Sequence, residues 1–119
     1  MHYLTPIFIL LLLLFTSSAH SADENDQYLV MGLGTSSCKA FLNEDTEGAA
    51  YYMSWLAGYM SQYNHLQEDT YSVLGPSKTS LELETWLRDY CSINGAESFE
   101  KAARNLIRNL RLFRLKTKP

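Results

Sequence analysis

The chain contains two cysteines, Cys38 and Cys91, and both follow an N-terminal segment that has the features of an export signal. The run from Ile7 to Phe15 is apolar throughout and too short to span the ~30 Å hydrocarbon core of a bilayer as a helix. Ala19-His20-Ser21 then supplies the small-x-small spacing that a signal peptidase recognises. We therefore predict a signal peptide over residues 1–21, cleaved near Ser21, and an exported mature protein. An uncleaved anchor is the alternative.

Two cysteines in an exported domain of about one hundred residues are expected to form one disulfide rather than a redox or metal site. A bridge between Cys38 and Cys91 would close a loop of about 54 residues, and the chain-entropy model assigns this closure about 4 kcal/mol of stabilisation. Two buried, unpaired thiols are the alternative. No cysteine lies near the predicted cleavage site, so the new N-terminus offers no attachment point for a lipid.

Apolar periodicity predicts an all-α fold, a small four-helix bundle with one disulfide, over residues 35–115. We expect residues 22–34 to be a flexible N-terminal tail and residues 116–119 to be a disordered C-terminal tail. The first helix is expected over residues 38–43, after an N-cap at Thr35, Ser36 or Ser37. The third is expected over residues 80–93, because Thr79 and Glu82 have the spacing of a capping box and Asn94-Gly95 is a helix stop.

The second helix, expected over residues 48–67, contains no charged residue. At 100° per residue its apolar and aromatic side chains share one wide face, with Trp55 at the edge. Small or neutral side chains occupy the opposite side. We therefore expect the central helix of the bundle, with a helix that meets a partner chain as the alternative. The wide face consists of Ala49, Tyr52, Met53, Leu56, Tyr59, Met60 and Tyr63.

The fourth helix, expected from an N-cap at Ser98 to Phe113, is amphipathic and basic. All 13 acidic residues lie at or before Glu100, whereas seven of the ten Lys and Arg residues follow it. We expect the basic face to lie against the acidic remainder of the same molecule, ahead of a partner protein and, third, an anionic membrane. The candidate partner or dimer surface combines two helices: Trp55, Tyr59 and Tyr63 from the second, and Arg104, Arg108 and Arg111 from the fourth.

Few residues of the mature chain could perform catalysis. Its one histidine, His65, is expected to be a solvated loop side chain, and the chain has no CxxC motif, phosphate-binding glycine loop or calcium loop. Glu44, Asp45 and Glu47 are expected to form a solvated acidic turn before the second helix, where their charge favours the helix dipole. A pI near 5.5 argues against nucleic-acid binding. We therefore expect a non-enzyme that needs no cofactor or metal.

Three segments carry a resemblance to known proteins. They are Cys38 at the start of a helix, Ser54-Trp55-Leu56-Ala57-Gly58-Tyr59, and Trp86-Leu87-Arg88-Asp89-Tyr90-Cys91 followed by Ser98-Phe99-x-x-Ala102-Ala103-x-x-Leu106. Over about residues 35–110 the chain resembles the periplasmic HdeA/HdeB acid-stress chaperones. It is equally similar to the Tai-type immunity proteins, which neutralise cell-wall amidases delivered by type VI secretion. Both groups share the cysteine and helix framework, so the resemblance implies the fold more directly than the activity.

The two resemblances imply different ways of binding protein. A chaperone of the HdeA type would be folded and self-associated at neutral pH and would loosen in acid to expose apolar surface. Protonation of all carboxylates would leave ten Lys and Arg residues, His65 and the new amino terminus, a net charge of about +12 that the disulfide would have to restrain. A Tai-type protein would be a dimer that occludes the active site of its partner enzyme.

We therefore expect an exported, non-enzymatic, protein-binding helical domain. Immunity-type inhibition of a secreted cell-wall-targeting effector is the first hypothesis. An HdeA-like periplasmic acid-stress chaperone, or an envelope protein with another role, is the alternative. The implied partner is an effector enzyme or unfolded client proteins, and a homodimer is compatible with both.

Overall fold

The computed structural model describes residues 22–23, 25–76 and 78–119, so the predicted signal peptide lies outside the described residues. The described part of the chain contains four α-helices and no strand, which confirms the all-α prediction. A short 3-10 helix precedes them and another follows. The elements are η2 (Gly32–Thr35), α2 (Cys38–Leu42), α3 (Thr46–Leu66), α4 (Ser80–Ile93), α5 (Phe99–Leu110) and η3 (Arg111–Phe113).

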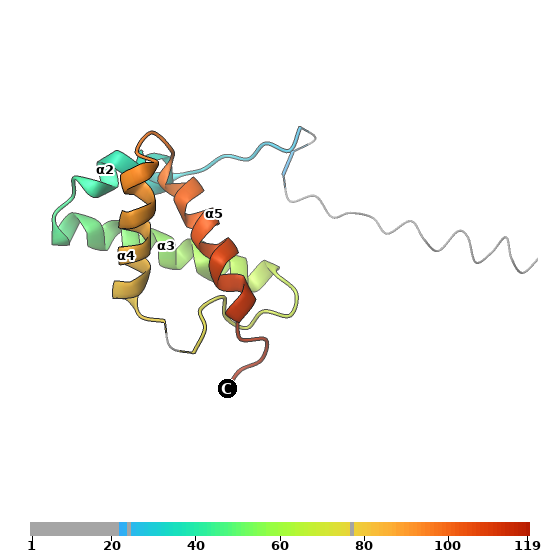
Figure 1. The fold of residues 1–119 in the computed structure, drawn as a ribbon. Coiled ribbons are helices and arrows are strands. Elements are labelled where there is room, and N and C mark those ends of the chain that lie inside the picture. Colours follow the sequence, from blue (N-terminus) through green and yellow to red (C-terminus); the bar gives the residue numbers. More distant parts are fainter. Residues whose placement is uncertain (1–21, 24, 77) are drawn as a thin grey trace, which may run out of the picture.

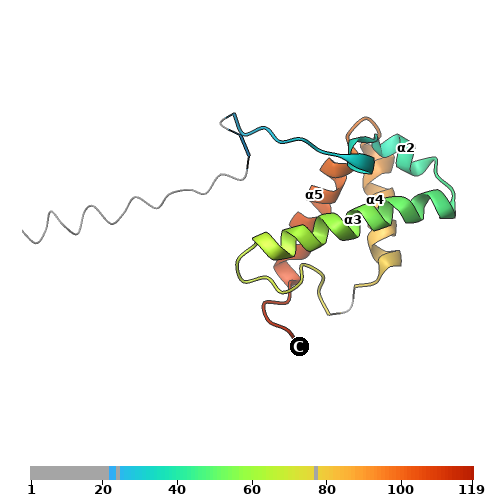
Figure 2. The ribbon, with the colours of Figure 1, turned by 180° about the vertical axis from the view of Figure 1, so that it is seen from behind.

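Helices α4 and α5 run antiparallel, and α3 crosses behind both of them (Figure 1). The reverse view has α3 in front of the pair (Figure 2). The short helix α2 packs against α4, and a disulfide joins Cys38 in the first turn of α2 to Cys91 in the last turn of α4. The Cα atoms of the two cysteines are 4.9 Å apart, and both side chains are fully buried. The predicted Cys38–Cys91 bridge is therefore present in the fold.

Side-chain caps begin each helix. Ser37 Oγ accepts a hydrogen bond from the Ala40 amide in α2, and Ser98 Oγ accepts one from the Lys101 amide in α5, both at 3.1 Å. The predicted capping box of α4 is complete, since each of its two residues bonds the other. These bonds satisfy amide groups that have no partner within the first turn of a helix.

Two helix boundaries differ from the prediction. Helix α3 begins at Thr46, two residues early, because Asp45 Oδ1 accepts a 2.8 Å hydrogen bond from the Gly48 amide and so caps the helix. Glu44, Asp45 and Glu47 are exposed, as expected of a solvated acidic turn, and Asp45 also caps the helix. The α-helical part of α5 ends at Leu110, and the last three residues before the C-terminal segment tighten into η3. Such 3-10 turns are frequent at helix ends.

Three aromatic rings from different helices meet at the centre of the core. The centroids of Phe41, Tyr52 and Phe99 are 4.9 to 5.2 Å apart. The Arg88 guanidinium covers the Phe41 ring at 5.0 Å and pairs with Glu84, as the i,i+4 spacing predicts. Around them the core is aliphatic: Leu56, Met60, Val73, Leu83, Leu87, Ala102, Ala103, Leu106, Ile107 and Leu110 are buried.

Helix α3 packs on one side only. The expected wide face is buried or half-buried, but Ser54, Gly58 and Ser61 on the opposite side are exposed. The sequence predicts α3 as the central helix of the bundle, but one of its sides faces solvent. Small neutral side chains are tolerated there because they face solvent. No helix among the described residues combines the length and the apolar character that a membrane crossing requires.

The segment before residue 35 contacts the helices. Leu33 packs against the core, Gly34 is buried, and the indole Nε1 of Trp55 donates a 2.9 Å hydrogen bond to the Met31 carbonyl. We call residues 28–35 the N-terminal strap. The strap therefore covers Trp55 and packs on the helical domain. The domain boundary at residue 35 stays a prediction.

Candidate protein-binding surface

Glu100 is the one buried charged side chain in the described part of the chain, with an exposed fraction of 3%. Its Oε1 accepts hydrogen bonds from the hydroxyls of Tyr59 at 2.7 Å and Tyr28 at 3.0 Å. Its Oε2 accepts a 3.0 Å hydrogen bond from Arg104 Nε. The strap, α3 and α5 therefore meet at a single carboxylate, and a buried charge paired in this way is satisfied.

This arrangement shifts the ionisation of the groups around the carboxylate. Burial, and then the hydrogen bond to Glu100, raises the pKa of Tyr59 well above its ordinary value. The same two causes raise the pKa of Tyr28. Burial is the largest single influence on Arg104 and lowers its pKa, but Glu100, Tyr28 and Tyr59 together outweigh burial and raise the pKa of that guanidinium. Both tyrosines therefore stay neutral donors, and Arg104 stays charged, across the physiological range.

The structure brings three of the six predicted surface residues together at this site. Trp55 stacks on Tyr59 with 5.0 Å between the ring centroids, and it meets Phe99 edge-on at 5.8 Å. Tyr59 and Arg104 both bond to Glu100. The result is an aromatic surface that the strap covers on one side.

The other three predicted residues lie elsewhere. Tyr63 and Arg111 line a shallow cleft of about 290 Å³ between the ends of α3 and α5, together with Gln67, Glu68, Leu112 and Arg114. Arg108 is exposed and has a long contact, 3.4 Å, with Asn105 Oδ1. The six residues therefore do not form one continuous site, and their role in binding a partner stays a prediction.

Two acidic residues balance part of the basic face of α5. Lys101 Nζ lies 2.8 Å from Glu97 Oε1, and Arg104 Nε lies 2.9 Å from Glu100 Oε1. Tyr90 also donates to Glu97, and these hydrogen bonds, that of Lys101 first, lower the pKa of the Glu97 carboxyl. These two pairs are local i,i+4 contacts at the start of α5, and the basic side chains are exposed, so the basic face does not lie against the acidic remainder of the molecule as expected. Arg108 and Arg111 have no ion pair within the described residues.

The sequence interpretation missed Glu100 and Tyr28. A signal for Glu100 exists: at 100° per residue it lies beside Ile107 at the edge of the apolar face, four residues before Arg104. Tyr28 has no such signal, because its partner is 72 residues away. His65 lies in the last turn of α3 rather than in a loop, and it is exposed as expected.

No group of three His, Cys, Asp or Glu side chains in the described residues could hold a metal ion. The site instead offers stacked aromatic rings beside a buried ion pair, features that suit contact with protein.

These features define a small all-α protein with a single disulfide and an aromatic surface covered by its own N-terminal strap. The chain belongs to the HdeA/HdeB family, whose model matches residues 4–99. No curated protein and no solved structure matches the chain. The match confirms the HdeA/HdeB resemblance and extends it over the strap. The Tai-type resemblance receives no support from these comparisons.

Proposed function

We propose that this protein is a periplasmic acid-stress chaperone that binds unfolded client proteins and has no enzymatic activity. Membership of the HdeA/HdeB family over residues 4–99 carries the proposal, because this family provides acid chaperones of the periplasm. Family membership favours the acid-stress chaperone over immunity-type inhibition of an effector. Two properties of the chain support it.

The first property is the size of the charge change in acid. At pH 2–3 carboxylates are protonated, so a mature chain that is weakly acidic at neutral pH acquires about +12 charges. Repulsion on this scale favours expansion of a small domain. The Cys38–Cys91 disulfide ties α2 to α4 and limits how far the expansion proceeds.

The second property is the covered aromatic surface. The strap lies over Trp55 and is held to the helices by a small number of polar contacts, among them Tyr28 to Glu100 and Trp55 to the Met31 carbonyl. Loosening of the strap would uncover Trp55 and its stacked neighbour Tyr59. Aromatic side chains of this kind bind apolar segments with little loss of conformational entropy.

Light scattering of acid-labile client proteins tests the proposal. We expect the mature protein to suppress aggregation of two unrelated clients at pH 2–3 and to have little effect at pH 7. The variant Trp55→Ala should need several-fold more protein for equal suppression, whereas Tyr51→Ala, which removes an exposed aromatic ring from the same helix, should act like the native chain. Absence of suppression at pH 2–3 would overturn the proposal. A tight complex with one secreted amidase at neutral pH would support the immunity-type function instead.

A further inference from the structure

Four large apolar side chains lie in solvent at one end of the molecule, which is formed by the C-terminal end of α3, the loop after it, and η3. Leu66 and Tyr71 are 66% and 47% exposed, and Leu112 and Phe113 are 77% and 69% exposed. The shallow cleft between the ends of α3 and α5 joins Leu112 to the residues that follow Leu66. Single exposed apolar residues are common, but a group of them marks an interaction surface.

Hydrogen bonds fix the C-terminal segment against this loop. The Leu115 amide donates to the Ser72 carbonyl at 2.9 Å, and the Leu115 carbonyl accepts from the Tyr71 amide at 2.8 Å. Arg114 Nε donates a 3.0 Å hydrogen bond to the Asp69 carbonyl. The segment is therefore part of an ordered surface at the end of the bundle (Figures 1 and 2). The exposure of its apolar side chains is a property of the folded chain.

The same end of the molecule is basic. Five Lys and Arg residues lie there, against two acidic residues in the loop, Glu68 and Asp69, in a chain whose formal net charge is −3. The five side chains have no ion pair within the described part of the chain. We call this surface the C-terminal patch, and it consists of Leu66, Tyr71, Leu112, Phe113, Arg108, Arg111, Arg114, Lys116 and Lys118.

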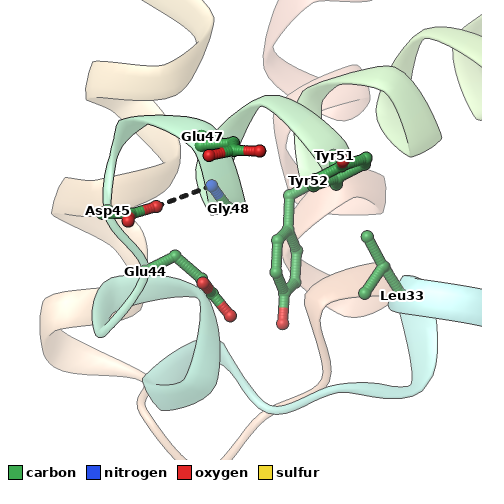
Figure 3. Close-up of a pocket in the computed structure, with 7 residues that line it drawn as sticks. All are labelled: Leu33, Glu44, Asp45, Glu47, Gly48, Tyr51 and Tyr52. Atoms are coloured by element: carbon green, nitrogen blue, oxygen red, sulfur yellow. Dashed lines mark hydrogen bonds between the residues drawn. The ribbon is translucent and has the colours of Figure 1, made fainter.

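A cluster of acidic side chains lies at the other end of α3. Glu44 and Glu47 stand beside the helix cap Asp45 where α2 leads into α3 (Figure 3). A helix of 21 residues is about 30 Å long, which is more than three Debye lengths at physiological ionic strength. The acidic cluster therefore neither pairs with the C-terminal patch nor cancels its attraction for a nearby anionic surface.

The composition of the patch sets the chemistry of its partner. Guanidinium groups bind phosphate oxygens through two parallel hydrogen bonds. Apolar side chains that alternate with cations enter the boundary between the headgroups and the acyl chains of a bilayer. In a partner protein, projecting side chains such as Leu112 and Phe113 need preformed pockets, whereas lipid headgroups move apart around them. The patch therefore suits an anionic lipid surface better than an acidic protein.

We propose that the C-terminal patch binds the surface of an anionic phospholipid membrane, with its Lys and Arg side chains on lipid phosphates and with Leu112 and Phe113 between the headgroups. The binding is peripheral and reversible, because the patch offers few apolar side chains. The strap and Trp55 pack at the first turn of α5, the other end of that helix, so the covered aromatic surface stays away from the lipid. The inference goes beyond the proposed function and does not depend on it.

Co-sedimentation of the mature chain with lipid vesicles at pH 7 provides the test. Vesicles of phosphatidylglycerol and phosphatidylcholine in equal parts should bind the chain about tenfold or more tightly than vesicles of phosphatidylcholine alone. High salt should weaken that binding by a similar factor, since exposed charges are screened. Arg108→Gln/Arg111→Gln and Leu112→Ser/Phe113→Ser should each weaken binding to the anionic vesicles by about fivefold or more.

Each double variant has a matched control. Lys39→Gln/Lys101→Gln changes the net charge as the arginine variant does, but at exposed lysines outside the patch. Tyr51→Ser/Ile93→Ser removes one aromatic and one aliphatic side chain, both exposed and both remote from the patch. Both controls should bind the anionic vesicles as the native chain does. Circular dichroism verifies that each variant is folded.

Lysine acetylation of the native chain locates the contact without any substitution. Anionic vesicles should slow the acetylation of Lys116 and Lys118 about threefold or more and leave that of Lys39 unchanged. Equal binding to both kinds of vesicle, equal losses in the patch and control variants, or uniform acetylation would overturn the inference. Binding to polyglutamate without binding to anionic vesicles would overturn it in favour of an acidic protein partner.

Discussion

The hydroxyl of Tyr59 in α3 donates a 2.7 Å hydrogen bond to Glu100 in α5, across 41 residues of sequence. This bond, with those from Tyr28 and Arg104, fixes the strap and α3 to the last helix through one buried carboxylate. Three donors converge on a group that is almost fully withdrawn from solvent. Loss of the carboxylate would leave all three donors without their acceptor.

Substitution of Glu100 should destabilise the fold more than substitution of a half-exposed acid in the same i,i+4 geometry. Glu100→Gln replaces the charged acceptor of three donors, and we expect a loss of about 1–3 kcal/mol in the free energy of unfolding at pH 7. Glu84→Gln removes the half-exposed pair with Arg88 and should cost no more than about 0.5 kcal/mol. Urea denaturation followed by far-ultraviolet circular dichroism measures both. Equal losses in the two variants would contradict the central role of Glu100.

The two glycines Gly34 and Gly58 should respond to alanine in opposite directions. A Cβ at Gly34 would overlap the indole ring of Trp55, so Gly34→Ala should destabilise by about 1–3 kcal/mol and change the Trp fluorescence. A Cβ at Gly58 meets nothing within 4 Å, and this residue lies in the exposed middle of α3. Gly58→Ala should therefore stabilise by about 0.5–1 kcal/mol. Thermal unfolding of the pair tests whether the strap packs on Trp55, and stabilisation by Gly34→Ala would show that it does not.

Reduction of the disulfide should remove a large share of the stability. The chain-entropy model assigns the bridge between Cys38 and Cys91 about 4 kcal/mol, which is substantial beside the 5–15 kcal/mol typical of a domain. Cys38→Ala/Cys91→Ala should lower the urea midpoint accordingly, and reductant should have the same effect on the native chain but none on the variant. Alkylation of both thiols in the unreduced native protein would contradict the bridge.

The stability should fall in acid partly through Glu97. Hydrogen bonds from Lys101 and Tyr90 lower the pKa of the Glu97 carboxyl in the folded chain. The contribution of Glu97 to the free energy of unfolding is therefore fully present above the unfolded-state pKa of about 4.3. It is lost as the pH falls through the lower folded-state pKa. Glu97→Gln and Lys101→Met should both make the decrease of the urea midpoint between pH 5 and pH 2 shallower. An unchanged slope in both variants would assign the acid sensitivity to other carboxylates.

Sequence patterns located the helices because the signals that start helices are local. Ser37, Ser98 and the Thr79–Glu82 pair each bond an amide three residues away, so spacing alone predicts them. Asp45 acts by the same rule, but its capping role was not predicted, so the predicted start of α3 falls two residues too late. The lack of charge in α3 indicated the central helix of the bundle, but a helix side without charges can be exposed as well as buried.

The sequence by itself determined the all-α class, the caps, the amphipathic α5 and the cysteine pair, because each depends on neighbouring residues or on the count of a single residue type. Only the tertiary structure decided that Glu100 accepts hydrogen bonds from Tyr28 and Tyr59, and that the strap covers Trp55. These features join residues far apart in the chain. Their geometry follows from how α3 crosses α4 and α5, and side-chain packing sets that crossing rather than any local pattern.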